Sequence, residues 1–489
     1  MTQPGILVQE RVLLLAERSG TDQSARFFRK AFSLPMGCVR LVITLTTDSP
    51  HPVQLPICLF DPCGNPRLMK AGHRVTQETL TYDIGEEYAC AGAIPGPLAE
   101  GEWKLVIYKR RMTDDVPVEL TIAWEAGENH ACHKAPPITF AADCLNKERR
   151  WYQGELHTHS DESTGRTSVA EVIDAARACG LDFLAITDHF TAAHWHTIQS
   201  VYDGQAPLLL QSMEVSGDRG HANFHGLQQW LNPLVDDNED LTEFLGLAER
   251  PSMNQLADAA HAQGGLMCIN HPLSGEMGWR YHEFDMHKAD LIETWCLSEK
   301  DATLGYPAFY DMLLARGYRL TAVGSSDSHH PTRPGPWQLG QVRTFIYANE
   351  LSQKGLLDGL RAGHAYISVN GCEMNLTASN GHTTAMMGDE LAMEVGRPVC
   401  VTVELSRHPK GNLFLYYNGC LLESCYVDHT EPAAFSFWLP EELSAEHAYV
   451  RAEFYEVEGK LPYYGYSWRN WQSLRLMSNP IYIKKGNEA

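Results

Sequence analysis

Two kinds of hydrophobic pattern divide the chain. Residues 1–148 hold short β-rich runs separated by turn signals, and these runs cover 40–48, 53–61, 102–111 and 117–124. Short strands in succession predict a β-sandwich-like domain, in which only 21–34 has a spacing that favours a helix. After residue 370 the pattern returns to strands, and Asn418-Gly419 predicts a hairpin. The sequence therefore predicts β-sandwich-like regions at both ends.

Residues 149–370 alternate between helical and buried-strand patterns. Helical spacing covers 167–180, 253–265, 306–317 and 351–363, with short apolar runs between these segments. Ser168 and Glu171 form a capping-box pattern, and Gly180 is a typical stop. Alternating helices and buried strands predict a parallel sheet or a (β/α) barrel. The expected fold class is multidomain α/β plus all-β, with domains at 1–148, 149–370 and 371–489.

Composition narrows the choice of partners. The length of 489 residues agrees with about three domains. The net charge of −22 argues against general binding to nucleic acid or anionic lipid, and a small anionic substrate would need locally placed cations. No signal-peptide or membrane-span pattern is recognisable. The 13 cysteines are scattered, which predicts reduced, mostly buried thiols in a cytoplasmic protein. The sequence is compatible with a homo-oligomer.

Histidines are concentrated in the middle region, which holds 14 of the 22. His157 and His159 lie two residues apart on an expected strand, so their side chains point to the same face. A single His-x-His pair is more often solvated than ligating. Further candidates follow later strands, however, and strand ends meet at one face of a barrel. The pattern favours a metal site built from His157, His159, His189, Glu214, His271, Asp327 and His329.

The order of the motifs resembles a known family. GELHTHS, ITDH, ME after an apolar strand, NHP and SSDSH are similar to motifs of the polymerase-and-histidinol-phosphatase (PHP) family of metallohydrolases. SNPIYI at 478–483 resembles the carbaryl-hydrolase-like (CehA/McbA) branch. The resemblance covers the middle region. It implies a distorted seven-stranded (β/α) barrel of PHP type that binds two or three divalent transition metal ions.

The resemblance also implies which residues bind each ion. The first ion would be bound by His157, His159, Glu214 and Asp327. The second would be bound by Glu214, His225 and His271, with His221 as the alternative to His225. The third would be bound by His189 and His329. Family members usually carry an aspartate for the third ion where this chain has Thr164. Either Asp161 or Glu162 compensates, or the third site is weak or empty. In that case His189 and His329 are free as proton donors or phosphate ligands.

The expected chemistry is hydrolysis. Imidazole and carboxylate ligands suit Mn, Zn or Fe, and ions that share a carboxylate generate a metal-bridging hydroxide near neutral pH. We expect Asp327, His189 and His329 to be catalytic, with the two histidines as candidate acids for the leaving group. The long loop 272–288 is a candidate lid. Each candidate phosphate-binding arginine is about as often a solvated loop residue, and these are Arg166, Arg280 and Arg333.

Three functions stay in competition. The favoured one is a phosphatase or phosphodiesterase that acts on a small phosphorylated metabolite or nucleotide. The first alternative is a hydrolase of carboxylic esters, amides or carbamates, which predicts an apolar pocket lined by Phe190, Trp195 and Trp337. The second alternative is a binding protein with a degenerate barrel, and the nearly complete ligand set argues against it.

Overall fold

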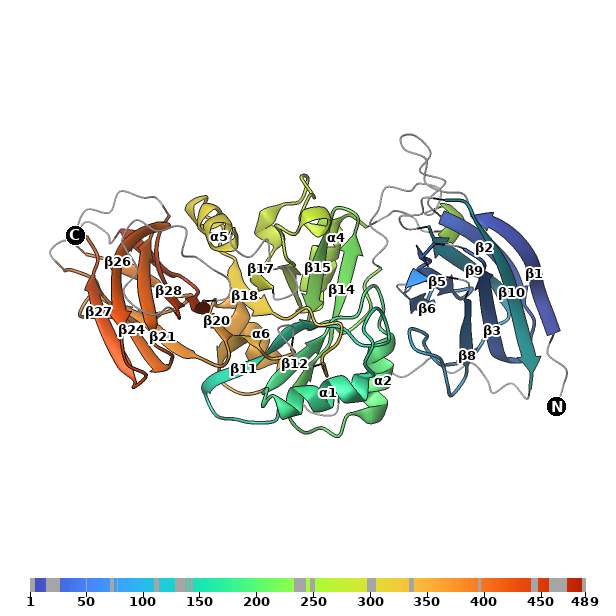
Figure 1. Cartoon of the computed structure of the whole chain (residues 1–489), viewed down its shortest axis with the longest axis horizontal. Coiled ribbons are helices and arrows are strands. Elements are labelled where there is room, and N and C mark those ends of the chain that lie inside the picture. The colour runs from blue at the N-terminus through green and yellow to red at the C-terminus, as the bar shows by residue number, and fades with distance from the viewer. Residues whose placement is uncertain are drawn as a thin grey trace.

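A computed structural model gives the fold of most of the chain. It describes residues 5–14, 27–49, 51–70, 74–76, 78–109, 114–127, 138, 140, 144–232, 243–246, 251–296, 305–333, 338–394, 397–440, 447–456 and 473–485. Figure 1 shows three parts in a row, with an N-terminal β region in blue, a middle region of mixed structure and a C-terminal β region in orange and red.

The N-terminal region is a sandwich of two antiparallel sheets. The first sheet runs β1 (Gly5–Leu14), β10 (Val116–Ala126), β3 (Cys38–Thr47) and β8 (Thr79–Gly85). The second sheet runs β2 (Phe27–Leu34), β9 (Gly101–Tyr108), β5 (Ile57–Phe60) and β6 (Pro66–Lys70). A short separate pair joins β4 (Val53–Gln54) to β7 (Arg74–Val75). Alternation along β9 places Leu105 and Ile107 in the shared core and Val106 on the opposite face. The helix expected over 21–34 is wrong for 27–34, which is a strand, and 21–26 lies outside the described residues.

The middle region holds two sheets. The first sheet has the strand order β13 (Leu208–Leu210), β12 (Phe183–Ile186), β11 (Arg150–Thr158), β19 (Val342–Ala348) and β20 (Ala365–Val369). The second sheet has the order β14 (Ser212–Gly217), β15 (Gly220–His225), β16 (Leu266–Ile269), β17 (Leu291–Cys296) and β18 (Thr321–Ser325). Isolated parallel bridges link them at Thr158–Ser328 and His189–Glu214. The hydrogen-bonded pairs among the described strands do not show a continuous barrel, and barrel closure stays a prediction. The pairing is parallel only in part, because β14, β15 and β16 pair antiparallel, as do β11, β19 and β20.

Four of the described helices lie where the periodicity predicts them, whereas the one at Ala193–Val201 was not predicted. The helices are α1 (Val169–Ala178), α2 (Ala193–Val201), α4 (Met253–Ala262), α5 (Tyr306–Ala315) and α6 (Gln353–Arg361), with 3-10 turns η2 (Gly275–Met277) and η3 (Met286–Lys288). The capping box of Ser168 and Glu171 is confirmed, and Gly180 takes φ 67° after the C-cap. His194 and His196 lie on α2.

The C-terminal region continues a sheet of the middle region. Its strands are β21 (Glu373–Ser379), β22 (Thr384–Met386), β23 (Glu390–Met393), β24 (Cys400–Arg407), β25 (Gly411–Tyr417), β26 (Cys420–Val427), β27 (Ala433–Trp438), β28 (Ala448–Tyr455), β29 (Leu474–Ser478) and β30 (Ile481–Lys485). β29 pairs with β20, and sheet β22-β21-β24-β27 shares one core with β25 and β28. The hairpin at Asn418-Gly419 is confirmed. The domain limits at 148 and 370 stay predictions.

Two further expectations concern the whole chain. The cysteines among the described residues are all free thiols, but only Cys38, Cys268, Cys296 and Cys372 are buried, so the expectation of mostly buried cysteines is wrong. None of the described helices is long and apolar enough to cross a membrane. The cytoplasmic location stays a prediction.

Candidate metal centre

Backbone hydrogen bonds bring the candidate ligands together from distant segments. The amide of His159 donates to the Ser328 carbonyl at 3.0 Å, and the amide of Asp327 donates to the His157 carbonyl at 2.9 Å. On the opposite side, the amide of Phe190 donates to the Glu214 carbonyl at 2.8 Å. The segments that carry the candidates therefore hold one another at the ends of their strands.

Glu214 lies at the centre of the cluster, and its side chain is fully buried. Its Oε2 lies 3.6 Å from His157 Nε2, 3.5 Å from His159 Nε2 and 2.7 Å from His189 Nδ1. Its Oε1 lies 3.1 Å from His221 Nδ1 and 4.0 Å from His271 Nε2. The two oxygens face different sets of imidazoles, which is the arrangement that a bridging carboxylate requires.

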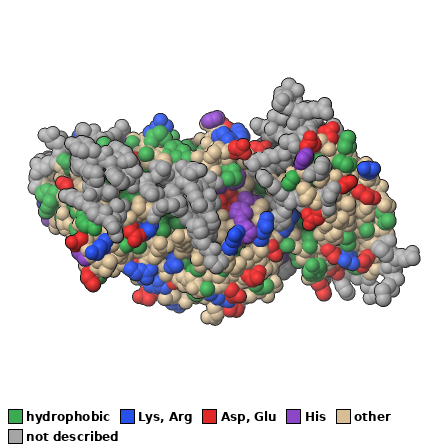
Figure 2. All heavy atoms as spheres, in the orientation of Figure 1, with side chains coloured by type: hydrophobic (Ala, Val, Ile, Leu, Met, Phe, Trp, Pro, Cys, Tyr) green, Lys and Arg blue, Asp and Glu red, His purple; other side chains and the backbone are tan. Residues whose placement is uncertain are grey.

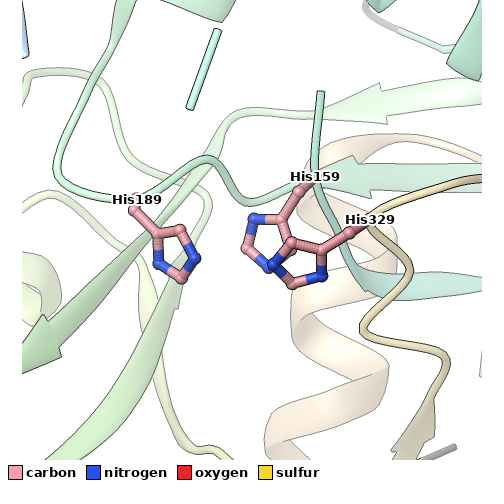
Figure 3. Close-up of side chains that lie close together, drawn as sticks. All are labelled: His159, His189 and His329. Carbon is pink, nitrogen blue, oxygen red and sulfur yellow. The ribbon is translucent and has the colours of Figure 1, made fainter. Parts of the chain in front are cut away.

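The potential ligand atoms form three groups, each within 4.8 Å. The groups are His157, His159 and Asp327; Glu214, His221 and His271; and His159, His189 and His329. Asp327 Oδ1 lies 3.3 Å from His157 Nε2 and 3.0 Å from His159 Nε2. Figure 3 shows the third group, in which three imidazoles enter the same space from separate segments. His329 is the most exposed of the three, because 37% of its side-chain surface is accessible.

Of the two rival histidines, the structure places His221 rather than His225 beside Glu214. His221 lies beside Glu214 and His271, whereas His225 belongs to none of the three groups and its Nδ1 meets Ser212 Oγ at 3.0 Å. In the β14–β15 ladder, Ser216 faces His221 and Ser212 faces His225. Both histidines therefore point to the same face, but only His221 lies near the end where His189 and its partner Ser216 meet.

The charges in the cluster fit a bound cation. Burial raises the pKa of Asp327, but His157 and His159 hold it well below its usual range. Burial lowers the pKa of His159 to about 3, with His189 and His329 adding to the effect, so its imidazole is neutral. Burial likewise lowers the pKa of His271. Ionised carboxylates and neutral imidazoles are the forms that bind metal ions.

An unpaired buried atom also fits a metal. His157 Nε2 is buried without a hydrogen-bond partner among the described residues. Burial lowers the pKa of His157, but Glu293, Asp327 and Glu214 raise it well above its ordinary value. The carboxylates thus attract positive charge at the position of Nε2. A metal ion beside the carboxylates of Asp327 and Glu214 would supply that positive charge. His157 Nε2 would then be free of a proton and able to coordinate the ion.

Two residues that support the centre were not expected from the sequence. Glu293, buried within β17, accepts from His157 Nδ1 at 2.8 Å and from the amide of His271 at 2.8 Å. Asn270 Nδ2 donates to Glu214 Oε1 at 3.0 Å. Such partners orient ligand side chains and fix their tautomers. The available signal for Glu293 was a lone carboxylate inside the apolar run LIETWC.

Backbone strain gathers at the same place. Of the five described non-glycine residues with positive φ, three lie here: His271 at 26°, Asp327 at 47° and Phe190, next to His189, at 63°; the other two are asparagines, which tolerate this conformation. Left-handed conformations of bulky residues cost about 1–3 kcal/mol and persist where the surrounding structure holds them. Strain at two candidate ligands and beside a third supports a functional centre.

Neither acidic neighbour of Thr164 replaces the missing aspartate. Glu162 Oε2 accepts from the amide of Gly92 at 2.5 Å, and its Oε1 accepts from the hydroxyl of Thr197 at 2.5 Å. Asp161 belongs to none of the three groups of potential ligands. The hydroxyl of Thr164 is buried without a hydrogen-bond partner in the described structure. The group of His159, His189 and His329 therefore has no carboxylate in the position expected from the family.

The three candidate arginines lie in two different environments. The amide of Arg166 donates to the carbonyl of His329 at 3.0 Å, and Arg166 and Arg333 make no ion pair within the described residues. Burial lowers the pKa of His330, and the charges of Arg166 and Arg333 lower it further, so both guanidinium groups lie in the neighbourhood of His330. Figure 2 shows histidines at the surface in the middle of the molecule with Lys or Arg side chains beside them. Arg280 differs, because its guanidinium donates to the carbonyls of Asp218 and Glu276.

An apolar pocket is not supported by the residues expected to line it. Trp195 is buried in the core, where its Nε1 donates to the Ser212 carbonyl at 2.8 Å. Phe190 packs against the N-terminal sandwich. Trp337 lies outside the described residues.

Comparison with models of protein families found no match, and no curated protein matches the chain. Among solved structures, the chain is similar to a two-domain protein from Bacteroides vulgatus that contains a predicted PHP-like metal-dependent phosphoesterase, with 16% identity and a TM-score of 0.36 over 66% of this chain and 95% of that chain. It is also similar to an amidohydrolase from Chromobacterium violaceum with bound sulfate, with 18% identity and a TM-score of 0.27 over 38% of this chain and 93% of that chain. Similarity at this level carries no argument, so the case for a metal centre rests on the side-chain geometry.

Proposed function

We propose that this chain is a metal-dependent hydrolase of the PHP type and that its substrate is a phosphoric ester. The observation that carries the proposal is the placement of buried Glu214, whose two oxygens face separate sets of histidines. Arg166, whose amide donates to the His329 carbonyl, and Arg333, whose amide donates to the His330 carbonyl, favour an anionic substrate near His329, since guanidinium groups bind phosphate through paired hydrogen bonds. Membership of the carbaryl-hydrolase-like branch and closure of a seven-stranded barrel belong to this proposal.

Each residue has a role in the proposed reaction. His157, His159, His221, His271, Glu214 and Asp327 would hold two ions, and His189 would bind a third ion or face the substrate together with His329. Bound ions such as Mn, Zn or Fe would activate water at neutral pH and stabilise negative charge in the transition state. Arg166 and Arg333 orient the phosphate. His329, the most exposed histidine of its group, donates the proton to the leaving group.

A metal and substrate screen tests the proposal. Purified full-length protein should contain two or three transition metal ions per chain, and with added manganese it should hydrolyse p-nitrophenyl phosphate or bis-p-nitrophenyl phosphate. Glu214→Gln should lose metal and slow hydrolysis by about 1,000-fold, on the scale of removing a group that stabilises the transition state. Glu404→Gln, on the surface of the C-terminal region, is the matched control. A chain without bound metal would contradict the hydrolase, and hydrolysis of naphthyl carbamates alone would contradict the phosphoesterase.

The arginines provide a second readout. Arg166→Met and Arg333→Met should raise KM for the phosphate ester about tenfold, because each removes a charged hydrogen-bond donor to the substrate. Arg280→Met should change KM less, since its guanidinium binds backbone carbonyls of the loop. Equal effects of all three substitutions would show that the phosphate does not lie beside His329.

A further inference from the structure

The N-terminal sandwich meets the middle region next to a candidate ligand. One face of its sheet β2-β9-β5-β6 packs against the middle region. In the apolar cluster between them, the sheet supplies Phe60, Met69 and Val106, and the middle region supplies Leu245, Phe190 and Trp230. The indole Nε1 of Trp230 donates to the Phe190 carbonyl at 2.8 Å. Phe190 directly follows His189, so the sandwich packs against the strained segment that carries this histidine.

A second contact reaches the hairpin that carries Glu214 and His221. The hydroxyl of Tyr108, at the end of β9, lies 2.8 and 3.0 Å from the two carboxylate oxygens of Asp218. Asp218 lies in the turn between β14 and β15. The sandwich therefore contacts both sides of the bridge between His189 and Glu214.

The closest contact is with the turn 160–167, which follows His159. The ammonium of Lys70, at the end of β6, donates to the Asp161 carbonyl, and the amide of Gly92 donates to the Glu162 carboxylate. A Cβ at residue 92 would lie 2.9 Å from the Glu162 carbonyl oxygen and 2.7 Å from Lys70 Cδ. Gly92 also has φ +86°. This close approach therefore requires glycine.

The same turn is held from its inner side. Asp188 Oδ1 accepts from the Ser160 amide at 2.9 Å, and its carboxylate also accepts from the hydroxyls of Ser160 and Ser163. At the far end of the turn, the amide of Arg166 donates to the His329 carbonyl. Asp188 on one side and Lys70 with Gly92 on the other thus hold a turn that connects His159 with the backbone of His329.

We propose that the N-terminal sandwich forms part of the metal centre, with Lys70 as a positioning residue that holds the turn 160–167 and thereby orients His159 towards the other ligands. The proposal rests on the metal centre proposed above. Lys70 and Gly92 touch no member of the three groups of potential ligands and act through the turn. The sandwich is then required for correct metal binding and is more than an attached module.

Substitution of both contact residues in the full-length chain tests this role. Lys70→Met removes the donor and keeps the length of the side chain, and Gly92→Ala introduces the blocked Cβ. Each should weaken binding of at least one Mn²⁺ ion about tenfold in competition with a chelator, as for other residues that orient ligands. Each should also change the visible absorption spectrum of Co²⁺-loaded protein. Lys70→Arg, which keeps charge and donor, should recover most of the affinity.

Two controls separate this role from general damage. Gly64→Ala is matched to Gly92→Ala, because Gly64 has φ +79° but nothing within 4 Å of its added Cβ. Lys30→Met removes a lysine that pairs with Glu10 in the same sandwich. Both controls should bind Mn²⁺ as wild type does. If Lys70→Met fails to fold by circular dichroism, Gly92→Ala and Gly64→Ala decide.

The outcomes distinguish the two proposals. Wild-type protein that binds no metal overturns the proposed function and this inference with it. Wild-type protein that binds metal, together with Lys70→Met and Gly92→Ala variants of unchanged affinity and Co²⁺ spectrum, overturns only the positioning role. Weakened binding in these two variants with normal binding in both controls supports it.

Discussion

The two β-sandwiches are attached to the middle region in different ways. The C-terminal one shares a sheet with it, since β20 and β29 pair antiparallel. Among the described residues, the N-terminal sandwich contributes no strand to the sheets of the middle region. It makes side-chain contacts with the turn 160–167, with Phe190 and with Asp218. One flank is therefore built into the fold, and the other lies against the candidate site.

Buried polar groups strengthen the C-terminal attachment. Arg451 on β28 is fully buried and donates to Asp311 of α5 and to Glu453. The side chain of Asn479 donates to the carbonyls of Ala322 and Ala365 and accepts from the amide of Ala322. Asn479 belongs to the motif SNPIYI, so this motif has a structural explanation. We expect changes here to affect folding first and changes at the N-terminal contacts to affect the site first.

The largest expected effect tests the C-terminal attachment. Asn479→Ala should destabilise the protein by about 3–5 kcal/mol, because backbone groups of Ala322 and Ala365 stay buried without partners and each costs about 1–3 kcal/mol. Urea denaturation followed by tryptophan fluorescence measures the loss. Asn375→Ala, which removes a hydrogen bond to exposed Glu404, should cost under about 0.5 kcal/mol. Equal losses for both variants would contradict the comparison.

The next effect isolates the centre from both flanks. Glu293→Gln should weaken Mn²⁺ binding about 10–100-fold, because the carboxylate that orients His157 is lost. Chelator competition measures the affinity. Glu404→Gln on the surface is the control. Unchanged affinity in Glu293→Gln would mean that Glu293 serves folding alone.

A smaller effect is expected at the N-terminal contact. Tyr108→Phe should lower the free energy of unfolding by about 1 kcal/mol, since one hydrogen bond to the carboxylate of Asp218 is lost. Denaturation under the same conditions allows direct comparison with Asn479→Ala. Tyr88→Phe, at a tyrosine that is 65% exposed, should have no measurable effect. A loss as large as that of Asn479→Ala would remove the distinction between the flanks.

The smallest effect concerns a pair that belongs to neither attachment. The hydrogen bond to Asp290 raises the pKa of His261 on α4, although burial opposes it. A raised folded-state pKa stabilises the protein below the unfolded-state pKa of about 6.5, and this contribution is lost as pH rises through the folded-state pKa. Because the histidine side chain is 35% exposed, the stability difference between wild type and His261→Gln should be about 0.5 kcal/mol larger at pH 5.5 than at pH 8.5. A difference that increases with pH would contradict this sign.

Local patterns in the sequence predicted many elements well. The capping box at Ser168, the stop at Gly180 and the hairpin at Asn418 need only neighbouring residues, and all three are confirmed. His157 and His159 share a face because strands have a period of two. The structure brings both close to Asp327 and Glu214, although their role as ligands stays a prediction.

Other features depend on contacts that the sequence does not encode locally. His221 and His225 are four positions apart on one strand, so their side chains point to the same face. The period of the strand therefore cannot predict which of the two lies beside Glu214. The register set by the turn at 218–219 decides which one lies beside Glu214. Glu293 was missed because nothing in its own strand shows that His157, 136 positions earlier, meets its carboxylate. The seven-stranded barrel stays a prediction, because among the described residues the two sheets of the middle region meet only through isolated bridges.

The sequence by itself determined the residue types available for a metal centre and their positions at or near the ends of strands. Only the tertiary structure decided that Glu214 faces two sets of histidines, that Glu162 turns towards Gly92, and that Lys70 reaches the turn after His159. The physical reason is the range of the interactions. Side-chain period and capping act over a few residues, whereas ligand sets and domain contacts join segments whose approach depends on packing of the whole chain.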